Sequence, residues 1–443
     1  MSADDSALFE RLRRLRRELS APRGAQLPQA PARDAPAAGV PEWLRARLAA
    51  GLRRPAPAPA AGSLAAPSRL LEESNDAGVH GARVERCARG ERHGAYGLDG
   101  WEDLPHDAFD RFARDGSLAR VDLGRAIFLD IETTGLSGGA GTYPFLVALG
   151  RFEGQGFEVW QGFLRGPEEE RALLKSAAER ISAADCIVSF FGKSFDRHRL
   201  EDKMRLHGIA PPFAGRPHLD LYHPCARLYR EALPDARLAT VERALCGVER
   251  GHDLSGAYAP AAWFDFLAGR PHRLEEIFRH NLLDVLSLVT LAAHVGCATR
   301  ERRGDGLPLE GHAGERALGL ARLALDRGER PEALRWLDLA LARGVRGARR
   351  ARVLRADVLR LAGEQERARD EYTALAKLED EHAVHALLEL AKDAEHRGRD
   401  PAAAAERCAR ARHILERACT GPVYARLKRE LDRREERLRA KLA

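Results

Sequence analysis

The chain has 443 residues, which is too long for one compact core and suggests two or three domains. Hydrophobic residues make up 44% and charged residues 31%, as in an ordinary globular protein. The net charge of +6 permits binding to a polyanion without requiring it.

Several classes of protein are disfavoured by the apolar runs, the N-terminus and the cysteines. No uninterrupted apolar run approaches the roughly 20 residues of a membrane helix, and the acidic N-terminus is unlike a secretory signal. The seven cysteines form no C-x-x-C pair, which argues against a zinc ribbon, an iron–sulfur cluster and a disulfide framework. We therefore expect a cytoplasmic protein with no membrane partner.

The N-terminal 120 residues show three kinds of sequence. Residues 6–20 carry leucines on one face of a short amphipathic helix. Residues 21–68 are rich in alanine and proline, which predicts a disordered linker. Residues 69–120 have mixed composition and are predicted to be a lead-in to the first core strand. The expected domains are thus 1–68 (helix and linker), 69–298 (with a core at 120–295) and 310–443.

The central region alternates short apolar runs with helical patterns. Strands are predicted at 126–129, 143–152, 157–164, 186–190 and 218–220, with a hairpin turn at 153–156. Helices are predicted from 167, over 194–206 and over 274–295, the first opened by proline and acidic residues. This order indicates an α/β fold, a mixed sheet flanked by helices.

The C-terminal region contains a repeat of 35 residues. Its glycines are Gly328, Gly363 and Gly398, each followed five residues later by alanine and preceded by alanine seven residues earlier. Small residues at such positions let antiparallel helices pack closely, and the period resembles that of tetratricopeptide repeats. An alanine-rich bundle without true repeats is the alternative. A basic helix at 424–442 would cap the stack.

The motif that carries the chemistry follows the first core strand. Asp130 and Glu132 lie two residues apart in the string Phe-Leu-Asp-Ile-Glu-Thr-Thr-Gly-Leu, so their side chains point to the same face. Paired carboxylates repel each other unless a cation lies between them, and hard oxygen ligands suit Mg²⁺ or Mn²⁺.

Two further segments add acids and a base. Asp196 ends the string Phe-Gly-Lys-Ser-Phe-Asp between a strand and a helix. His280 and Asp284 lie four residues apart within a helix, hence on one helical face. Four acids and one base are the components of a phosphodiesterase that uses two metal ions.

These motifs resemble the DEDD superfamily of 3′–5′ exonucleases, which have the ribonuclease-H-like fold, and more narrowly the YprB-like family of predicted bacterial exonucleases. The resemblance implies that Asp130, Glu132, Asp196 and Asp284 hold two divalent ions, Mg²⁺ or Mn²⁺. It makes His280 the general base or the group that orients the attacking water. It also places Thr134 and Leu136 against the terminal nucleotide.

Other polar residues are weighed beside this set. Lys193 is a candidate contact to the nucleic-acid backbone, because Gly192-Lys193-Ser194 lacks the first glycine of a phosphate-binding loop. Asp220, on a short strand, is either a fifth acid of the site or, as the sequence favours, a structural hydrogen-bonding residue.

Three functions follow from these residues. The first is a metal-dependent 3′–5′ exonuclease acting on DNA or RNA, on a single-stranded 3′ end, with a protein partner at the C-terminal repeats. An endonuclease on branched or hybrid substrates would use the same metal chemistry. The second class is a catalytically weak or inactive nucleic-acid-binding scaffold that recruits a protein partner through those repeats. The spacing of His280 supports the second, because histidine-type relatives place this residue five, not four, positions before the last aspartate.

Overall fold

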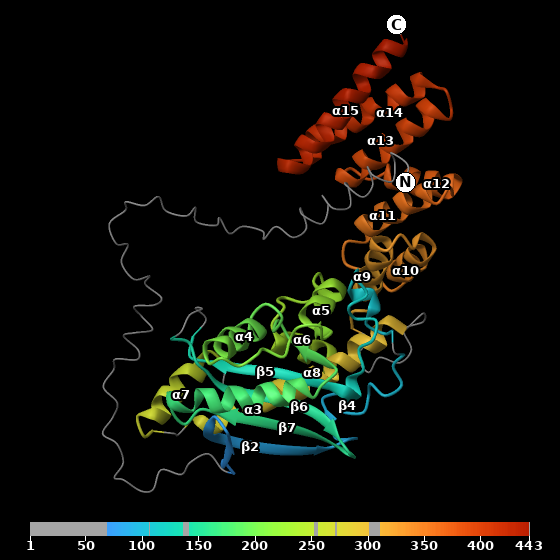
Figure 1. Cartoon of the computed structure of the whole chain (residues 1–443). Helices are drawn as coiled ribbons and strands as arrows, with labels where there is room; N and C mark the ends of the chain where they lie inside the picture. The colour runs from blue at the N-terminus through green and yellow to red at the C-terminus, as the bar shows by residue number, and fades with distance from the viewer. Residues whose placement is uncertain are drawn as a thin grey trace, which may run out of the picture. The chain divides into compact units, whose positions relative to one another are not determined.

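The computed structural model describes residues 69–105, 107–135, 141–251, 256–270, 273–300 and 311–442. The helix expected at 6–20 and the linker expected at 21–68 lie outside this part of the chain. In the described part, a mixed sheet with flanking helices is followed by a region made only of helices (Figure 1).

Seven strands form the main sheet. They are β1 (Leu71–Asn75), β2 (Gly78–Ala88), β5 (Ala126–Thr133), β6 (Pro144–Glu153), β7 (Gly156–Phe163), β8 (Cys186–Ser189) and β9 (His218–Asp220). Their order is β1-β2-β7-β6-β5-β8-β9, and a second, small sheet pairs β3 (Arg92–His93) with β4 (Tyr96–Gly97). The strands from β1 to β5 pair antiparallel, whereas β8 runs parallel to both β5 and β9. The carboxyl ends of β5, β8 and β9 therefore meet at one edge of the sheet.

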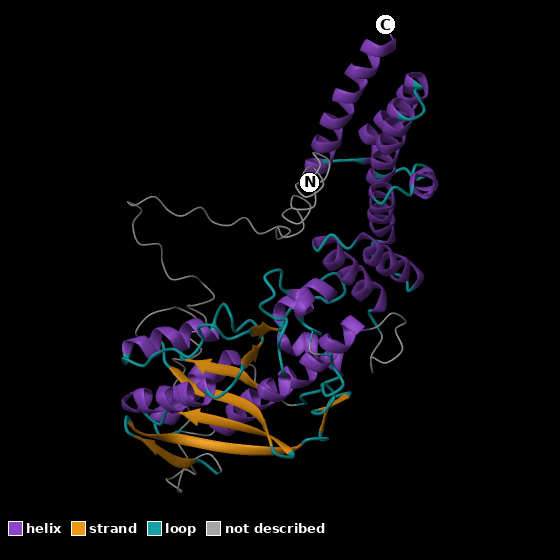
Figure 2. Ribbon diagram, turned by 45° about the vertical axis from the view of Figure 1, so that its right-hand side comes forward, coloured by secondary structure: helices purple, strands orange, loops and turns teal. Residues whose placement is uncertain are grey.

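Helices cover both faces of this sheet (Figure 2). One face packs against α3 (Glu170–Ser182), α4 (Asp196–Leu206) and α7 (Ala259–Leu267). The other packs against α5 (Tyr222–Tyr229), α6 (Leu238–Cys246) and α8 (Leu274–Arg300). Short 3-10 helices occur at Asp110–Phe112, Leu123–Arg125, Pro167–Glu169 and Gly256–Tyr258. Alternation along β5 sends Ile127 and Leu129 to the first core and Phe128 to the second.

Helix α8 is unusually apolar for a chain in which no membrane-length apolar run was expected. By length and composition, its segment Leu274–Thr299 would be able to span a membrane, and it is the single such helix among the described residues. However, 78% of its most apolar window is buried inside the protein. Its apolar side chains, such as Val285 and Val289, are accounted for by the core beneath the sheet.

The C-terminal region consists of packed helix pairs. Its helices are α9 (Ala313–Asp326), α10 (Arg330–Ala342), α11 (Ala348–Leu361), α12 (Gln365–Leu375), α13 (Glu381–His396), α14 (Pro401–Ala418) and α15 (Gly421–Leu442). Each repeat glycine lies in the turn within a pair, and Gly328 and Gly363 adopt left-handed backbone with φ of 79° and 86°. The repeat alanines Ala321, Ala356 and Ala391 are fully buried. The 35-residue spacing is therefore one helix pair.

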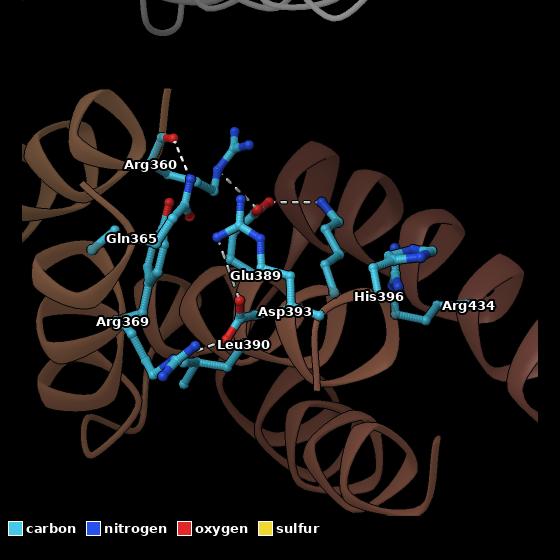
Figure 3. Close-up of a pocket in the computed structure, with 12 residues that line it drawn as sticks. Arg360, Gln365, Arg369, Glu389, Leu390, Asp393, His396 and Arg434 are labelled. Atoms are coloured by element: carbon cyan, nitrogen blue, oxygen red, sulfur yellow. Dashed lines mark hydrogen bonds and ion pairs between the residues drawn. The ribbon is translucent and has the colours of Figure 1, made fainter. Parts of the chain in front are cut away.

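A hollow of about 250 Å³ lies among α11, α12, α13 and α15 (Figure 3). Its charged side chains form ion pairs within the wall. Arg369 donates to Asp393 at 2.9 Å, and Lys392 donates to Glu389 at 2.6 Å. Glu389 and Asp393 are the two acids of the lining, so the arginines and the lysine leave the hollow with an excess of positive charge.

The first C-terminal helix shares a core with the sheet region. Leu318, Ala321 and Leu325 of α9 belong to the same buried cluster as Tyr229 of α5. A Cβ added at Gly319 would lie 2.7 Å from the Cα of Leu228, so glycine is required at this approach. The predicted boundary between 298 and 310 therefore crosses continuous apolar packing.

The structure confirms most predicted elements and corrects one. The strands expected at 126–129, 143–152, 157–164, 186–190 and 218–220 correspond to β5, β6, β7, β8 and β9. The lead-in expected at 69–120 was too simple, because residues 71–88 form two strands of the main sheet. The inner part of β2, from His80 to Arg83, is buried although its residues are polar or small. Such a strand lacks the apolar alternation that reveals strands in a sequence.

Candidate acidic site at the sheet edge

The first two acids lie together at the end of β5. Asp130 and Glu132 are half-buried and alternate with the buried Ile131, so both point to the face covered by α8. The pairing of β5 with β6 shifts register between Glu132 and Thr133, directly after the second acid. Such irregularities re-aim side chains at the ends of strands.

Asp196 reaches the same place from the start of α4. Asp196 is the first residue of α4 and is only 7% exposed. The loop before it runs close to its carboxylate, since a Cβ added at Gly192 would lie 2.8 Å from Asp196 Oδ2. Only glycine leaves room for the acid at this position.

Asp220 holds that loop in place. It lies at the end of β9, is 3% exposed, and accepts hydrogen bonds from the backbone N–H groups of Phe191 at 2.7 Å and Lys193 at 3.0 Å. A third N–H, that of Tyr222, donates to it at 3.2 Å. These bonds fit the structural role that the sequence favoured for Asp220.

Helix α8 contributes three polar residues to the site. His280 Nε2 lies 3.5 Å from Asp284 Oδ2, as expected for residues four apart on one helical face, and 3.9 Å from Glu132 Oε1. The buried Asn281 donates from Nδ2 to Asp130 Oδ2 at 2.6 Å. Its own Oδ1 accepts from Gln161 Nε2 at 3.0 Å. Asp130 is thus oriented by a fixed amide network.

The buried Arg250 lies beside the acids of the site. Arg250 Nη2 contacts Asp284 Oδ1 at 2.5 Å, and its Nε and Nη2 donate to the two oxygens of Glu242 at 2.5 and 2.6 Å. Glu242 and Asp284 raise the pKa of the Arg250 guanidinium against the opposing effect of its burial. Arg250 is therefore a permanent cation beside the acids.

Arg250 also determines which nitrogen of His280 bears the proton. Its Nη1 lies 3.4 Å from His280 Nδ1. A guanidinium only donates, so Nδ1 accepts in this contact and the neutral ring carries its proton on Nε2. That proton faces the carboxylates of Asp284 and Glu132.

Two of the acids have strongly perturbed protonation. Loss of hydration on burial, followed by repulsion from Asp220 and Asp284, raises the pKa of Asp196 to about 8. Burial, followed by repulsion from Asp284, Asp196 and Glu132, raises the pKa of Asp130 well above its ordinary value. Crowded carboxylates with raised pKa values are typical of functional sites.

The donor set fits hard divalent cations in its chemistry. Four carboxylates converge from β5, α4 and α8, and a cation between them would relieve the repulsion that raises the pKa values of Asp130 and Asp196. As the side chains stand, no three His, Cys, Asp or Glu residues within the described ranges are close enough to bind a metal together. A cation would therefore have to draw the acids closer.

The three expected substrate contacts have different outcomes. The Thr134 hydroxyl accepts a hydrogen bond from the Tyr143 N–H at 3.0 Å, so it closes the end of the β5–β6 pair. Lys193 is exposed on the loop beside Asp196. Leu136 lies outside the described residues. Contact of these residues with a nucleotide therefore stays a prediction.

Sequence reasoning missed Arg250, Glu242, Asn281 and Gln161. Asn281 stands inside the motif that contains His280 and Asp284, so its place next to His280 was a usable signal. Arg250 lies 30 residues before His280 and has no motif of its own. Its contact with Asp284 is produced by the fold alone.

The comparisons with known proteins bear on the fold of the sheet region. Residues 127–296 match the family model described as "RNase_H superfamily". Over 279 residues the chain is 28% identical to "Uncharacterized protein YprB" of Bacillus subtilis (strain 168). That similarity covers 62% of this chain and 65% of the relative, so it spans slightly less than two thirds of the relative's length. The sheet region of this chain is thus a domain of the RNase H superfamily, in a protein with distant homology to YprB.

Proposed function

We propose that the chain is a metal-dependent 3′–5′ exonuclease that hydrolyses phosphodiester bonds of DNA or RNA. The observation that carries the proposal is the convergence of Asp130, Glu132, Asp196 and Asp284, with raised pKa values at Asp130 and Asp196. Membership of a superfamily that contains nucleases supports the choice of substrate.

In this proposal the four acids hold two divalent ions, Mg²⁺ or Mn²⁺. Bound ions would neutralise the charge that develops on the phosphate and its leaving oxygen. Asn281 fixes the orientation of Asp130, and Asp220 fixes the loop that carries Asp196. Arg250 keeps Asp284 from turning away. The residues around the acids thus hold the ligand set in position.

His280 has a narrower role than general base in the arrangement described here. Its Nε2 proton faces Asp284 and Glu132, and its Nδ1 accepts from Arg250. In that tautomer the ring donates toward the acids, which suits it to orient the attacking water. To act as general base it would have to be released from Arg250.

One observation favours the alternative of an inactive scaffold. Arg250 contacts Asp284 at 2.5 Å and so supplies part of the positive charge that a metal ion would otherwise bring. If that pair persists with nucleic acid bound, the protein would bind oligonucleotides without cleaving them. Its helix pairs would then recruit a protein partner.

The test is digestion of single-stranded DNA and RNA labelled at the 5′ end, with Mg²⁺, Mn²⁺ or EDTA. Asp130→Ala protein, purified in parallel, controls for contaminating nucleases. An exonuclease would give a metal-dependent ladder that shortens from the 3′ end and is absent in the variant. Cleavage of circular single-stranded DNA would instead establish an endonuclease. Binding without cleavage of either substrate would favour the scaffold.

A further inference from the structure

The loop before Asp196 holds an aromatic side chain in an unfavourable position. Phe191 is 47% exposed and has a φ of 61°, in the left-handed region that bulky residues rarely adopt. Neither property helps the protein fold, because the ring gains little burial and the backbone is strained. Strain of this kind is retained where the surrounding structure fixes it for another purpose.

Phe191 belongs to a row of rings that we call the aromatic shelf, formed by Phe191, Tyr222 and His223. The ring centroids of Phe191 and Tyr222 lie 5.1 Å apart, and those of Tyr222 and His223 lie 5.4 Å apart. Both contacts are edge-on, at 70° and 80° between the planes. In such a T-shaped contact the edge of one ring covers a face of the other, and the part of Phe191 that remains exposed offers surface to a further flat group.

The shelf is joined directly to the acidic site. Asp220 Oδ1 accepts from the backbone N–H groups of both Phe191 and Tyr222, so one carboxylate fixes the two rings. The same carboxylate contributes to the raised pKa of Asp196. Gly192, next to Phe191, passes against Asp196 itself. A group bound on the aromatic shelf would therefore lie next to a group bound by the acids.

Resting on the proposed function, we propose that the aromatic shelf stacks on an unpaired nucleobase beside the scissile phosphate. Every nucleobase has a π-face, and aromatic side chains stack on bases with little preference for sequence. Bases inside a duplex are already stacked on each other. The substrate class is therefore a single-stranded end, selected through its exposed bases.

The test measures binding in an Asp130→Asn background, so that cleavage does not interfere. Fluorescence anisotropy would follow a labelled single-stranded oligonucleotide as Phe191→Gly is added. Glycine suits the φ of 61°, so the thermal midpoint should be unchanged or higher while the Kd rises roughly tenfold. Phe191→Tyr keeps the ring and should bind like the parent. Leu206→Ala removes another exposed apolar side chain, on α4, and should also bind like the parent.

An oligonucleotide with abasic residues at its 3′ end separates stacking from a general effect on the loop. The parent protein should bind it about as weakly as Phe191→Gly does, and the glycine substitution should cause little further loss. An equal tenfold loss on intact and abasic strands would overturn the proposal, as would unchanged binding of the intact strand by Phe191→Gly. Failure of the Asp130→Asn protein to bind any oligonucleotide would instead contradict the proposed function itself.

Discussion

Asp130 in the sheet region and Glu395 in the helical region are both acids at poorly exposed positions, yet their surroundings are opposite. Asp130 has three other carboxylates as its charged neighbours, and its pKa is raised. Glu395, at the end of α13, accepts from Arg434 at 2.6 Å and from Arg437 and Lys441 at 2.8 Å. Burial opposes its charge, but the hydrogen bonds from Arg437 and Lys441 lower its pKa to about 2.

The contrast separates two uses of buried charge. At Glu395 one carboxylate is held by three cations of α15, so the cluster fastens α15 to α13 and contributes to stability. The acidic site leaves repulsion among carboxylates in the folded protein, which lowers stability and is relieved by protonation or by a cation. Crowding of carboxylates is therefore a better guide to function than the number of charged residues. The four predictions below each test one side of this comparison.

The largest effect is expected from Asp130→Asn. If Asp130 holds a metal ion as proposed, its removal should lower nuclease activity at least about a thousandfold, which corresponds to roughly 4 kcal/mol in the transition state. The amide removes a repelling charge, so the variant should melt no lower than the unaltered protein. Digestion of the end-labelled strand and a thermal melt would be measured together. Full activity in the variant would contradict the role of the acidic site.

Glu395→Gln should have the next largest effect, and on stability alone. The change leaves the cations of α15 without their counter-charge, which costs about 3 kcal/mol, the lower end for breaking a buried ion pair. Urea unfolding followed by circular dichroism measures this loss. The exposed Glu436 of the same helix supplies the control, because Glu436→Gln should change stability little. Nuclease activity should be unchanged in both variants.

Asp196→Asn should stabilise the metal-free protein at alkaline pH. The folded pKa of about 8 lies above the unfolded value of about 3.9. The folded state therefore holds the proton more tightly, and stability is lost as the pH rises between these values. At pH 8–9 the amide should raise the melting temperature, with little difference near pH 4, as measured by thermal melts. With Mn²⁺ present the order should reverse, because only the unaltered protein gains binding energy.

The smallest effect is the acid sensitivity of the helical region. The pKa of Glu395 is lowered in the folded state, so its contribution is present above about pH 4.5 and is lost as the pH falls toward 2. At pH 3.5 only part of that contribution has gone, so urea midpoints should fall by less than in Glu395→Gln at neutral pH. The variant should show a flatter dependence over this window. Parallel curves for the two proteins would show that Glu395 does not titrate there.

Much of the fold was readable from the sequence because its signals are local. The apolar runs of β5 to β8 and the glycine repeat of the helix pairs each lie within a few residues. Strand β2 was not predicted, because its buried segment contains His80 and Arg83. These side chains form hydrogen bonds with Ser176 and Glu275, which are distant in the sequence. The apolar pattern of a strand predicts it only when apolar contacts are what bury it.

The candidate site divides in the same way. Asp130 with Glu132, and His280 with Asp284, were paired by spacing alone, and the structure places each pair together. Arg250 and Gln161 come to the acidic site from distant parts of the sequence, so no spacing of residues in the sequence predicts their contacts. Phe191 belongs to the motif that ends at Asp196, but its exposure and its left-handed backbone follow from the fold and not from the motif.

The packing of α9 against α5 has a practical consequence for dissecting the molecule. Leu318, Ala321 and Leu325 fill a core whose remaining side belongs to the sheet region. A chain cut after residue 300 would expose that apolar surface to water and would be prone to aggregate. The first helix pair thus covers one side of the core of the sheet region. Because Val345, Ala351 and Val358 belong to the same cluster, a fragment that retains residues through Leu361 is the smallest one we expect to remain monodisperse.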